Sequence, residues 1–477
     1  NSGTAISLSA TGSTVFVTYP ANKSAYSDVG VNRDYLADGN IDAGKPLILN
    51  TDNSVTQVGM VSGTQNYTFS KGSATALVPA DTSVYVTSCF DISAQRFIVV
   101  YTNEDASNYV YGNLVEVDSS NVVTSRGIDT IINSSYGGET PSIAYDSANQ
   151  KSMLVYHRGG AFGGDLRGKV LTATGSSLSV GAEVIINDGD GSGTRQKVVY
   201  EPTSGKLVVS YIDQSNTSDL TAQVGTISGT TSSWSSNTLV SSSGTVTQLG
   251  LGAGNGKVLF LYKKSSSDSE ARAGTISGTT LTLGSAVQFE TENVSDGYPQ
   301  SDNKVCYDTQ NDRFFTCYQA DSDTGYGRVF EISGTTVTFG TRNLILYRAQ
   351  EFSLPHFSDI GKIPLIFGVY VSDSLYYREA TITSSNNSIT YNTDVTLSTA
   401  NTSATSLAYD STNVRLLPTY HLANENIEAY GIVPNGSRAG VVSNLSNNYF
   451  GVASTNVVSG EQVGVNRSGS FNNNQSG

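Results

Sequence analysis

The chain carries an acidic residue at one position of a repeated pattern, directly before a short polar turn. Carboxylates that converge in a folded chain could act as acid and base in the hydrolysis of a glycosidic bond. A short acid that begins a hairpin turn also accepts hydrogen bonds from the backbone N–H groups that follow it. Because every one of these acids begins such a turn, the pattern favours the turn role. The five positions are Asp91, Asp146, Glu201, Asp308 and Asp410.

The three histidines are poor candidates for a metal site or a catalytic base. His157 and His421 each follow the repeated aromatic residue of their unit, at a position where other units have Thr, Ile, Lys or Gln. A position that accepts so many residue types is typical of a surface loop, and no third ligand has a suitable spacing. His356 is expected to be a partly buried strand residue.

Cys89 and Cys306 occupy the same position of the repeat, where other units have Ala or Val. Such a position is small and buried, so we predict that Cys89, Cys306 and Cys317 are buried free thiols without a chemical role. The alternative is a disulfide between Cys306 and Cys317, which flank one predicted hairpin turn, although cross-strand geometry often strains such a bond.

One segment has the residue types of a calcium site. Asp188 and Asp190 lie two residues apart among glycines that permit a tight turn and expose backbone carbonyl groups, which suits Ca²⁺. The segment lacks the length and the distal Glu of an EF-hand loop, so the alternative is a flexible connection. Ca²⁺ bound by these two acids is the only cofactor that the sequence suggests.

These residues belong to a unit that recurs along the chain. A short strand, a polar turn, often a basic residue, and a second strand ending in an aromatic residue recur from Tyr101 onward at steps of 49 to 56 residues. The second half of a unit is two short strands around a Ser-Gly turn, as in TISGTT. Each unit therefore reads as four short β-strands in hairpin order. The eight aromatic positions are Tyr19, Tyr101, Tyr156, Tyr211, Tyr262, Tyr318, Phe367 and Tyr420.

A four-stranded unit of about fifty residues is typical of one blade of a β-propeller. One such sheet cannot bury its own faces, whereas radial stacking of several sheets buries a continuous apolar layer. The composition, with 48 Gly and 27 Tyr, fits short strands and many turns. We predict an all-β fold with a single propeller of four-stranded blades. Eight blades are favoured because eight aromatic positions recur, and seven result if the first and last copies share a blade.

The propeller is expected to span residues 1–440. The step from Tyr19 to Tyr101 is longer than the others, and residues 25–56 account for the excess as an insertion in the first blade. By strand order this insertion replaces the loop between strands two and three. Residues 441–477 break the period, and we expect them to form a short C-terminal β extension that leads to a further domain.

The charge balance excludes two classes of partner. The chain has 27 Lys and Arg against 41 Asp and Glu, and its formal net charge is −14. A surface that binds nucleic acid or anionic membrane needs clustered basic residues, so neither partner is expected. No stretch approaches eighteen consecutive apolar residues, and we therefore expect no membrane-spanning helix.

The loops between strands two and three all emerge on one face of a propeller, and we expect them to contain aromatic and arginine residues. Aromatic planes with hydrogen-bonding groups nearby suit the recognition of a polysaccharide or a protein. The alternative is that several of these side chains cover the seams between blades. The candidate binding residues are Tyr109, Tyr111, Arg158, Phe162, Arg167, Tyr326, Arg328, Tyr376, Tyr377 and Arg378.

The repeated phrase, in which an aromatic residue and an acid precede a turn and are followed by KLVVSY and VGTISGTT, resembles the repeats of structural proteins of tailed bacteriophages. The matching proteins are of the tail-fibre or virion-appendage type. The tail NNYFGVASTNVVSGEQVGVNRSGSFNNNQSG looks like the start of the small β module that closes such proteins. The resemblance covers residues 84–477 and carries no catalytic motif. The resemblance implies a non-enzymatic structural and binding module that is virion-borne or extracellular. It also implies that the chain forms a homo-oligomer with other structural subunits, and that it engages a host surface or a cell-surface glycan.

Two other functions remain open at this point. A secreted bacterial adhesin or surface filament subunit would have similar repeats. A polysaccharide-degrading propeller enzyme would bring two or more acids together near the central channel or on the loop face. The sialidase-type box, which needs an Asp, a Gly and a Trp in a fixed turn, cannot recur, because the chain has one tryptophan.

Overall fold

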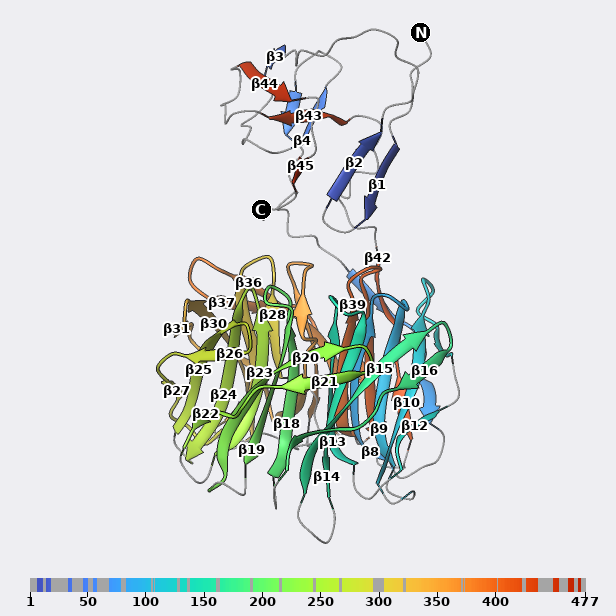
Figure 1. Cartoon of the computed structure of the whole chain (residues 1–477), viewed down its shortest axis with the longest axis vertical. Coiled ribbons are helices and arrows are strands. Elements are labelled where there is room, and N and C mark those ends of the chain that lie inside the picture. The colour runs from blue at the N-terminus through green and yellow to red at the C-terminus, as the bar shows by residue number, and fades with distance from the viewer. Residues whose placement is uncertain are drawn as a thin grey trace. The chain divides into compact units, whose positions relative to one another are not determined.

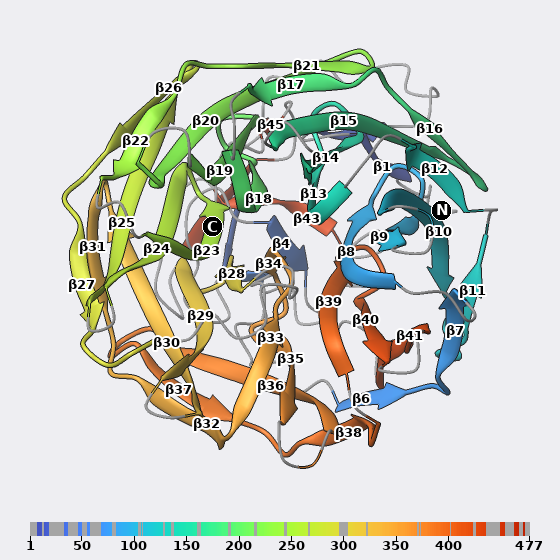
Figure 2. The ribbon, with the colours of Figure 1, turned by 90° about the horizontal axis from the view of Figure 1, so that it is seen from below.

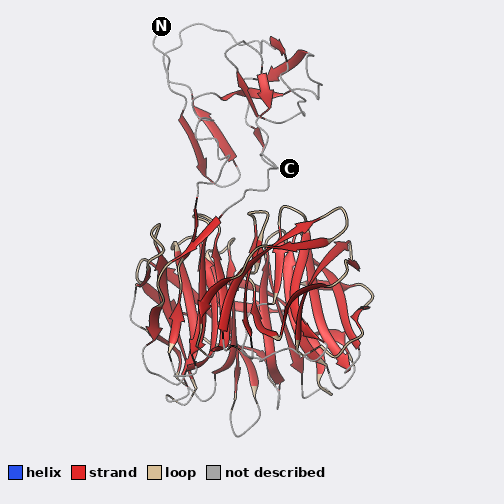
Figure 3. Ribbon diagram, turned by 180° about the vertical axis from the view of Figure 1, so that it is seen from behind, coloured by secondary structure: helices blue, strands red, loops and turns tan. Residues whose placement is uncertain are grey.

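The computed structural model of the chain consists of strands and turns, and no helix occurs among the residues that it describes (Figure 3). It describes residues 68–435 apart from short gaps at 79–82, 104–105, 107, 127–128, 135–137, 160–163, 189–191, 214–216, 243–245, 266–267, 295–303, 321–322, 370–371, 373, 401 and 423–425. Outside that range it describes only strands between residues 7 and 57 and between 449 and 472. The described part therefore offers no helix able to cross a membrane.

Seven sheets stand side by side in a ring over residues 68–435 (Figures 1 and 2). Blade 1 is β8 (Ser83–Asp91), β9 (Arg96–Asn103), β10 (Tyr109–Val117), β11 (Val123–Ser125) and β12 (Thr130–Asn133). Blade 2 is β13 (Gly138–Asp146), β14 (Lys151–Arg158), β15 (Asp165–Thr174), β16 (Ser177–Val180) and β17 (Val184–Asn187). Blade 3 is β18 (Ser192–Glu201), β19 (Lys206–Asp213), β20 (Asp219–Ser228), β21 (Thr231–Trp234) and β22 (Thr238–Ser241).

The remaining blades follow the same order. Blade 4 is β23 (Thr247–Gly254), β24 (Lys257–Ser265), β25 (Asp268–Ser277), β26 (Thr280–Leu283) and β27 (Val287–Glu290). Blade 5 is β28 (Val305–Asp308), β29 (Arg313–Ala320), β30 (Thr324–Ser333), β31 (Thr336–Phe339) and β32 (Asn343–Tyr347). Blade 6 is β33 (Ala349–Ser353), β35 (Ile363–Val369), β36 (Ser374–Thr383), β37 (Ser388–Tyr391) and β38 (Val395–Ser398). Blade 7 is β39 (Thr402–Asp410), β40 (Arg415–Leu422), β41 (Ile427–Ala429) and β42 (Ile432–Asn435), joined by β6 (Thr68–Lys71) and β7 (Thr75–Val78).

Each blade has the four antiparallel strands that the repeat predicts. The first strand lies nearest the axis and the fourth lies at the rim (Figure 2). The fourth strand is interrupted, so that in blade 1 both β11 and β12 pair with β10. The Ser-Gly turns between the third and fourth strands need a left-handed residue, which Gly229 and Gly278 supply with φ values of 60° and 61°. The β-propeller prediction is confirmed.

The ring has seven blades, because the first and last repeat copies share one. Strands β39 to β42 come from the last copy, and β6 and β7 come from the second half of the first copy. Strand β42 pairs with β6 and β41 pairs with β7. These hydrogen bonds close the ring and leave no unpaired edge between its two ends. Of the two blade numbers left open by the sequence, the less favoured one is correct.

The chain divides into two compact units, and the boundary differs from the expected one. The propeller is Tyr67–Asn435, and residues 1–66 and 436–477 form the other unit. In that unit, β4 (Pro46–Leu49) pairs with β5 (Val55–Gln57) and with β43 (Tyr449–Ala453). Strand β3 (Arg33–Leu36) pairs with β44 (Gln462–Asn466), which also pairs with β43.

Residues 25–56 are therefore not a loop of the first blade. Their strands form one sheet with the C-terminal strands β43 and β44, since a strand without a partner leaves its backbone groups unpaired. The first repeat copy gives the hairpin of β1 (Ser7–Thr11) and β2 (Thr14–Thr18), and β2 also pairs with β45 (Phe471–Asn472). This copy therefore contributes no first or second strand to a blade.

The repeated aromatic residues from Tyr101 onward lie in the buried seams between blades, whereas Tyr19 lies outside the described residues. Tyr156, Tyr211, Tyr262 and Tyr420 are fully buried. The Tyr262 hydroxyl donates to Glu270 at 2.7 Å, and the Tyr420 hydroxyl donates to Glu428 at 2.8 Å. Burial raises the pKa of Tyr211 to about 12. The period seen in the sequence is therefore the period of the core.

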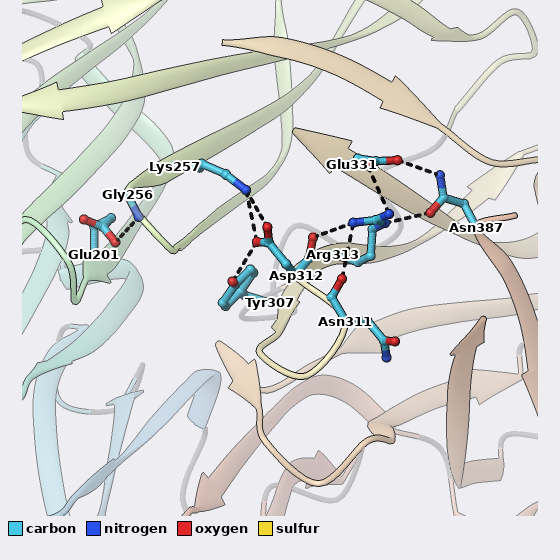
Figure 4. Close-up of polar contacts among 9 residues, drawn as sticks. All are labelled: Glu201, Gly256, Lys257, Tyr307, Asn311, Asp312, Arg313, Glu331 and Asn387. Carbon is cyan, nitrogen blue, oxygen red and sulfur yellow. Dashed lines mark hydrogen bonds and ion pairs between the residues drawn. The ribbon is translucent and has the colours of Figure 1, made fainter. Parts of the chain in front are cut away.

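Polar contacts join neighbouring blades at the face that carries the turns between first and second strands, which we call the turn face (Figure 4). The backbone N–H of Gly256 in blade 4 donates to Glu201 in blade 3 at 2.8 Å. Lys257 in blade 4 pairs with Asp312 in blade 5 at 2.8 Å. Arg313 in blade 5 donates to Asn387 in blade 6 at 2.8 Å. The basic residue of the repeat thus contributes to blade stacking.

Candidate functional site

The repeated acids are occupied by their own turns. Asp146 accepts hydrogen bonds from the N–H groups of Ala148 and Asn149, both at 3.0 Å. The other four acids accept from the same two turn positions. All five acids are at most 2% exposed. The predicted turn role is confirmed, and in each acid at least one carboxylate oxygen is held by the turn.

The three thiols are buried and free. Burial raises the pKa values of both the Cys306 and Cys317 thiols well above their usual value. Cys306 pairs across the hairpin with Phe315, not with Cys317, so the ladder does not place the two sulfur atoms opposite each other. The structure therefore confirms buried free thiols rather than the alternative disulfide.

The histidines differ in part from expectation. His157 and His421 are each only 9% exposed and therefore do not lie on surface loops. The second strand continues past the repeated tyrosine, and His157 pairs within the sheet with Leu166. Burial lowers the pKa of His421. Within the described residues, no group of three or more His, Cys, Asp or Glu side chains could hold a metal ion.

The predicted calcium segment is only partly described. Asp188 follows β17 and is exposed. Asp190 lies outside the described residues, so Ca²⁺ binding by this pair stays a prediction.

The predicted binding residues lie mainly on third strands, and the described ones have structural contacts. Arg328 lies over the rings of Phe289 and Phe339. Arg378 forms an ion pair with Asp394. The other contacts are Tyr377 with Glu379, Arg158 and Arg167 with Glu183, and the rings of Tyr111, Tyr326 and Tyr376 with Tyr101, Tyr318 and Phe367.

These contacts favour the alternative that the side chains stabilise blades and seams. The residues come from blades 1, 2, 5 and 6, and the described contacts do not bring them into one cluster. Tyr109 is half-buried at the start of β10. Phe162 lies outside the described residues. A binding role for these residues stays a prediction. The structure has a different candidate binding site, a pocket at the central channel.

A pocket of about 270 Å³ lies at the central channel on the turn face, lined by the inner strands or turns of six blades and by residues 355–357 of blade 6. Each blade contributes side chains to it, and none of the lining residues is Asp, Glu, Lys or Arg. The lining residues are Ser88, Cys89, Phe90, Ile92, Ala144, Tyr145, Ser147, Tyr200, Pro202, Ala253, Tyr307, Thr309, Pro355, His356, Phe357, Leu407, Ala408, Tyr409 and Ser411.

An incomplete ring of aromatic side chains lines this pocket. In six blades the ring residue is the last but one residue of the first strand, just before the turn, and in blade 6 it is Phe357 of β34. The residue is aromatic in every blade except blade 4. There the residue is Ala253. The seven ring residues are Phe90, Tyr145, Tyr200, Ala253, Tyr307, Phe357 and Tyr409.

The tyrosine hydroxyls of this ring bond to turn residues. The Tyr145 hydroxyl accepts from the Ser93 N–H in the turn of blade 1 at 3.2 Å. The Tyr307 hydroxyl donates to Asp312 at 2.8 Å. Tyr409 donates to Asp359 of blade 6. Because the hydroxyls are held in the turns, the surface that these residues offer the pocket is mainly ring carbon.

Blade 6 partly obstructs the channel. After β33, the segment 354–356 leaves the blade, and β34 (Phe357–Ser358) pairs in parallel with β28 of blade 5 (Figure 2). The His356 side chain, through Nε2, hydrogen-bonds to the Ile143 carbonyl oxygen of blade 2 at 2.9 Å. A side chain of blade 6 thus reaches across the axis to blade 2 and lines the pocket. His356 is half-buried, as the sequence predicts, but it lies between β33 and β34 and not in a strand.

Sequence reasoning did not find this pocket, although a signal for it was present. The aromatic residue before the turn acid was visible in the repeat, and it belongs to the strand that lies nearest the axis. Seven such positions around one axis must face a common centre. The departure of residues 354–358 from blade 6 has no comparable signal.

Comparisons with known proteins add little on function. No protein-family model matches the chain, and no curated protein matches it. Among solved structures, a crystal structure of a mutant of AofleA from Arthrobotrys oligospora is similar to 62% of this chain and 84% of its own, with 10% identity and a TM-score of 0.40. At that level the similarity carries no argument about a ligand.

Proposed function

We propose that the propeller is a non-enzymatic binding module and that the central pocket on the turn face is its ligand site. One observation carries the proposal: seven blades place their inner residues around one pocket of about 270 Å³. Concave, mainly apolar pockets with few polar groups are the usual form of a ligand site. The buried tyrosines at the seams and the acids in the turns have a role in folding. The pocket has no such role in the fold.

The lack of a carboxylate in the lining favours binding over hydrolysis. A glycosidase needs two carboxyl groups flanking the scissile bond. The nearest repeated acids are each held by two backbone N–H groups of their own turns. Using them as acid or base would break the turns that form the rim of the pocket.

The biological setting that we propose is a virion appendage or another extracellular assembly. The repeat phrase supports this, since it resembles the repeats of phage structural proteins. In that setting the module joins other structural subunits, in a homo-oligomer, and engages a host surface. An adhesin or surface filament subunit would use the same pocket.

A fragment screen tests whether the pocket is the ligand site. Ligand-observed NMR with a library of small neutral and charged fragments is run on the full chain and on the variant Ala253→Phe, which fills part of the pocket. Ala286→Phe is the matched control, because Ala286 is exposed in the connection between β26 and β27 at the rim of the same blade. Fragments should bind the wild type and the control and lose binding to Ala253→Phe. Equal binding to all three proteins contradicts the proposal.

A further inference from the structure

The ring of aromatic side chains around the pocket has a gap in blade 4. The contacts of the ring tyrosines in other blades indicate what would fill this gap. Three ring tyrosines bond to the turn of the preceding blade: Tyr145 to Ser93, Tyr200 to Ser147 and Tyr409 to Asp359. Blade 4 has Ala253 instead, so the turn of blade 3 receives no aromatic ring from its neighbour. Pro202 of that turn lines the pocket.

The backbone of blade 4 allows the next aromatic residue to lie close. A side chain at Gly254 would place its Cβ 2.2 Å from the Tyr307 ring, and one at Gly252 would lie 2.4 Å from Val305. Glycines in β23 therefore let blade 5 pack against the blade 4 backbone. Tyr307, Ala253 and Pro202 of the blade 3 turn all line the pocket, and the gap in the ring of aromatic side chains lies at Ala253.

Several polar groups of the lining already have protein partners. Ser88 shares a 2.6 Å hydrogen bond with Ser406, and Thr309 donates to the Ser358 carbonyl at 3.2 Å. His356 bonds to the Ile143 carbonyl oxygen. A ligand hydroxyl or amide that left water for this pocket would find few partners, which makes its burial unfavourable.

The charge and the size of the pocket further limit the class of ligand that it could bind. With no charged side chain in the lining, an ion would lose its hydration without a counter-charge. An apolar cavity of about 150 Å³ holds one benzene molecule, so a pocket of this size has room for a fused bicyclic ring. Aromatic rings also pack favourably against other aromatic rings in edge-to-face and offset arrangements.

We propose that the pocket takes a neutral aromatic ring, which occupies the gap at Ala253 and completes the ring of aromatic side chains. This inference rests on the proposed function and specifies its ligand class. Two sources could present such a ring: a free aromatic molecule, or an aromatic side chain on a partner protein. The recognition chemistry is the same for both.

Calorimetric titrations of the full chain test the proposal with four probes. Indole is the neutral ring and N-acetyl-tryptophanamide carries the same ring on a peptide-like group, whereas methyl β-glucoside is a neutral sugar and choline is a cation. Indole should bind at least about tenfold tighter than the glucoside or choline. Comparable binding of N-acetyl-tryptophanamide would support a protein-borne ring, and its exclusion would support a free molecule.

Two pocket variants test whether indole binds in the central pocket, and the second variant serves if the first does not fold. Ala253→Phe should weaken indole binding by about tenfold or more, whereas the exposed control Ala286→Phe should leave it unchanged. Thr309→Phe, at an exposed lining position in the turn of blade 5, serves if the first variant does not fold. Tighter binding of the glucoside or choline, lost in Ala253→Phe, would overturn the inference and leave the proposed function standing. Unchanged indole binding in both pocket variants would overturn the two together.

Discussion

Asp146 shows what the repeated acid does at the scale of a single residue. Its carboxylate is buried and accepts two backbone N–H groups and the Asn149 side-chain amide at 2.7 Å. Asp146→Ala leaves these donors without a partner and should lower the free energy of unfolding by about 1–3 kcal/mol. Urea unfolding measures this. The exposed Asp188 provides the control: Asp188→Ala should change stability by less than about 0.5 kcal/mol. Equal stability of the two variants would contradict the turn role.

Glu351 should make stability depend on pH. Burial raises the pKa of its carboxyl from 4.5 to about 7, against the lowering effects of the Thr402 hydrogen bond and the Lys304 charge. The folded chain therefore holds a proton at pH values where the unfolded chain has released it. The contribution to stability is complete below about pH 4.5 and is lost as the pH rises through about 7.

The variant Glu351→Gln isolates this effect. Between pH 5 and pH 8, the wild type should lose up to about 3 kcal/mol more of its unfolding free energy than the variant loses. Urea unfolding at the two pH values gives the comparison. If both proteins respond to pH in the same way, the carboxyl is ionised in the folded state and the assignment is wrong.

The close approach of two inner strands is tested at the scale of the element. Gly254 ends β23, and a Cβ there would lie 2.2 Å from the Tyr307 ring of β28. Gly254→Ala should therefore destabilise the chain by about 1–3 kcal/mol through overpacking. In a chain that already carries Tyr307→Ala, the same change should cost much less, because the clash is gone. If the changes in unfolding free energy are additive in this double-mutant cycle, the two residues do not crowd each other.

At the scale of the element, the sequence predicts the blades better than it predicts the central pocket. Turn acids, Ser-Gly turns and seam tyrosines recur with the unit, because each one satisfies a local requirement of a hairpin or a blade. The pocket depends on where the strands lie relative to the axis, and that is a property of the whole ring. His157 was misjudged for a related reason: variation at its position suggested a loop, whereas the strand continues beyond Tyr156.

At the scale of the whole molecule, blade 7 holds the ring together. It joins residues 68–78 to residues 402–435, and Leu77 of β7 packs in the cluster that contains Val117 of blade 1 and Ile427 of blade 7. Leu77→Ala should lower the unfolding free energy by about 2–5 kcal/mol. It should also speed amide hydrogen exchange in β6, β7 and β41. Ala76→Ser, at the exposed neighbouring position, is the control.

Blade 7 was within reach of sequence reasoning, whereas the division of the chain was not. The count of repeat copies already allowed seven blades if the first and last copies share one, and residues 68–78 and 402–435 form that blade. That residues 25–56 form a sheet with residues 441–477 could not be predicted, because neither segment follows the repeat. Unchanged exchange rates in the Leu77→Ala variant would show that closure does not depend on this packing.

The central claim is that the pocket on the turn face is where the propeller binds its ligand. A crystal structure of the full chain soaked with indole tests it most directly. The account predicts one ordered ring beside Ala253, between Pro202 and Tyr307, packed against the aromatic side chains that surround the pocket. An empty central pocket with indole ordered elsewhere, for example at Tyr376 on the third strand of blade 6, would contradict the account.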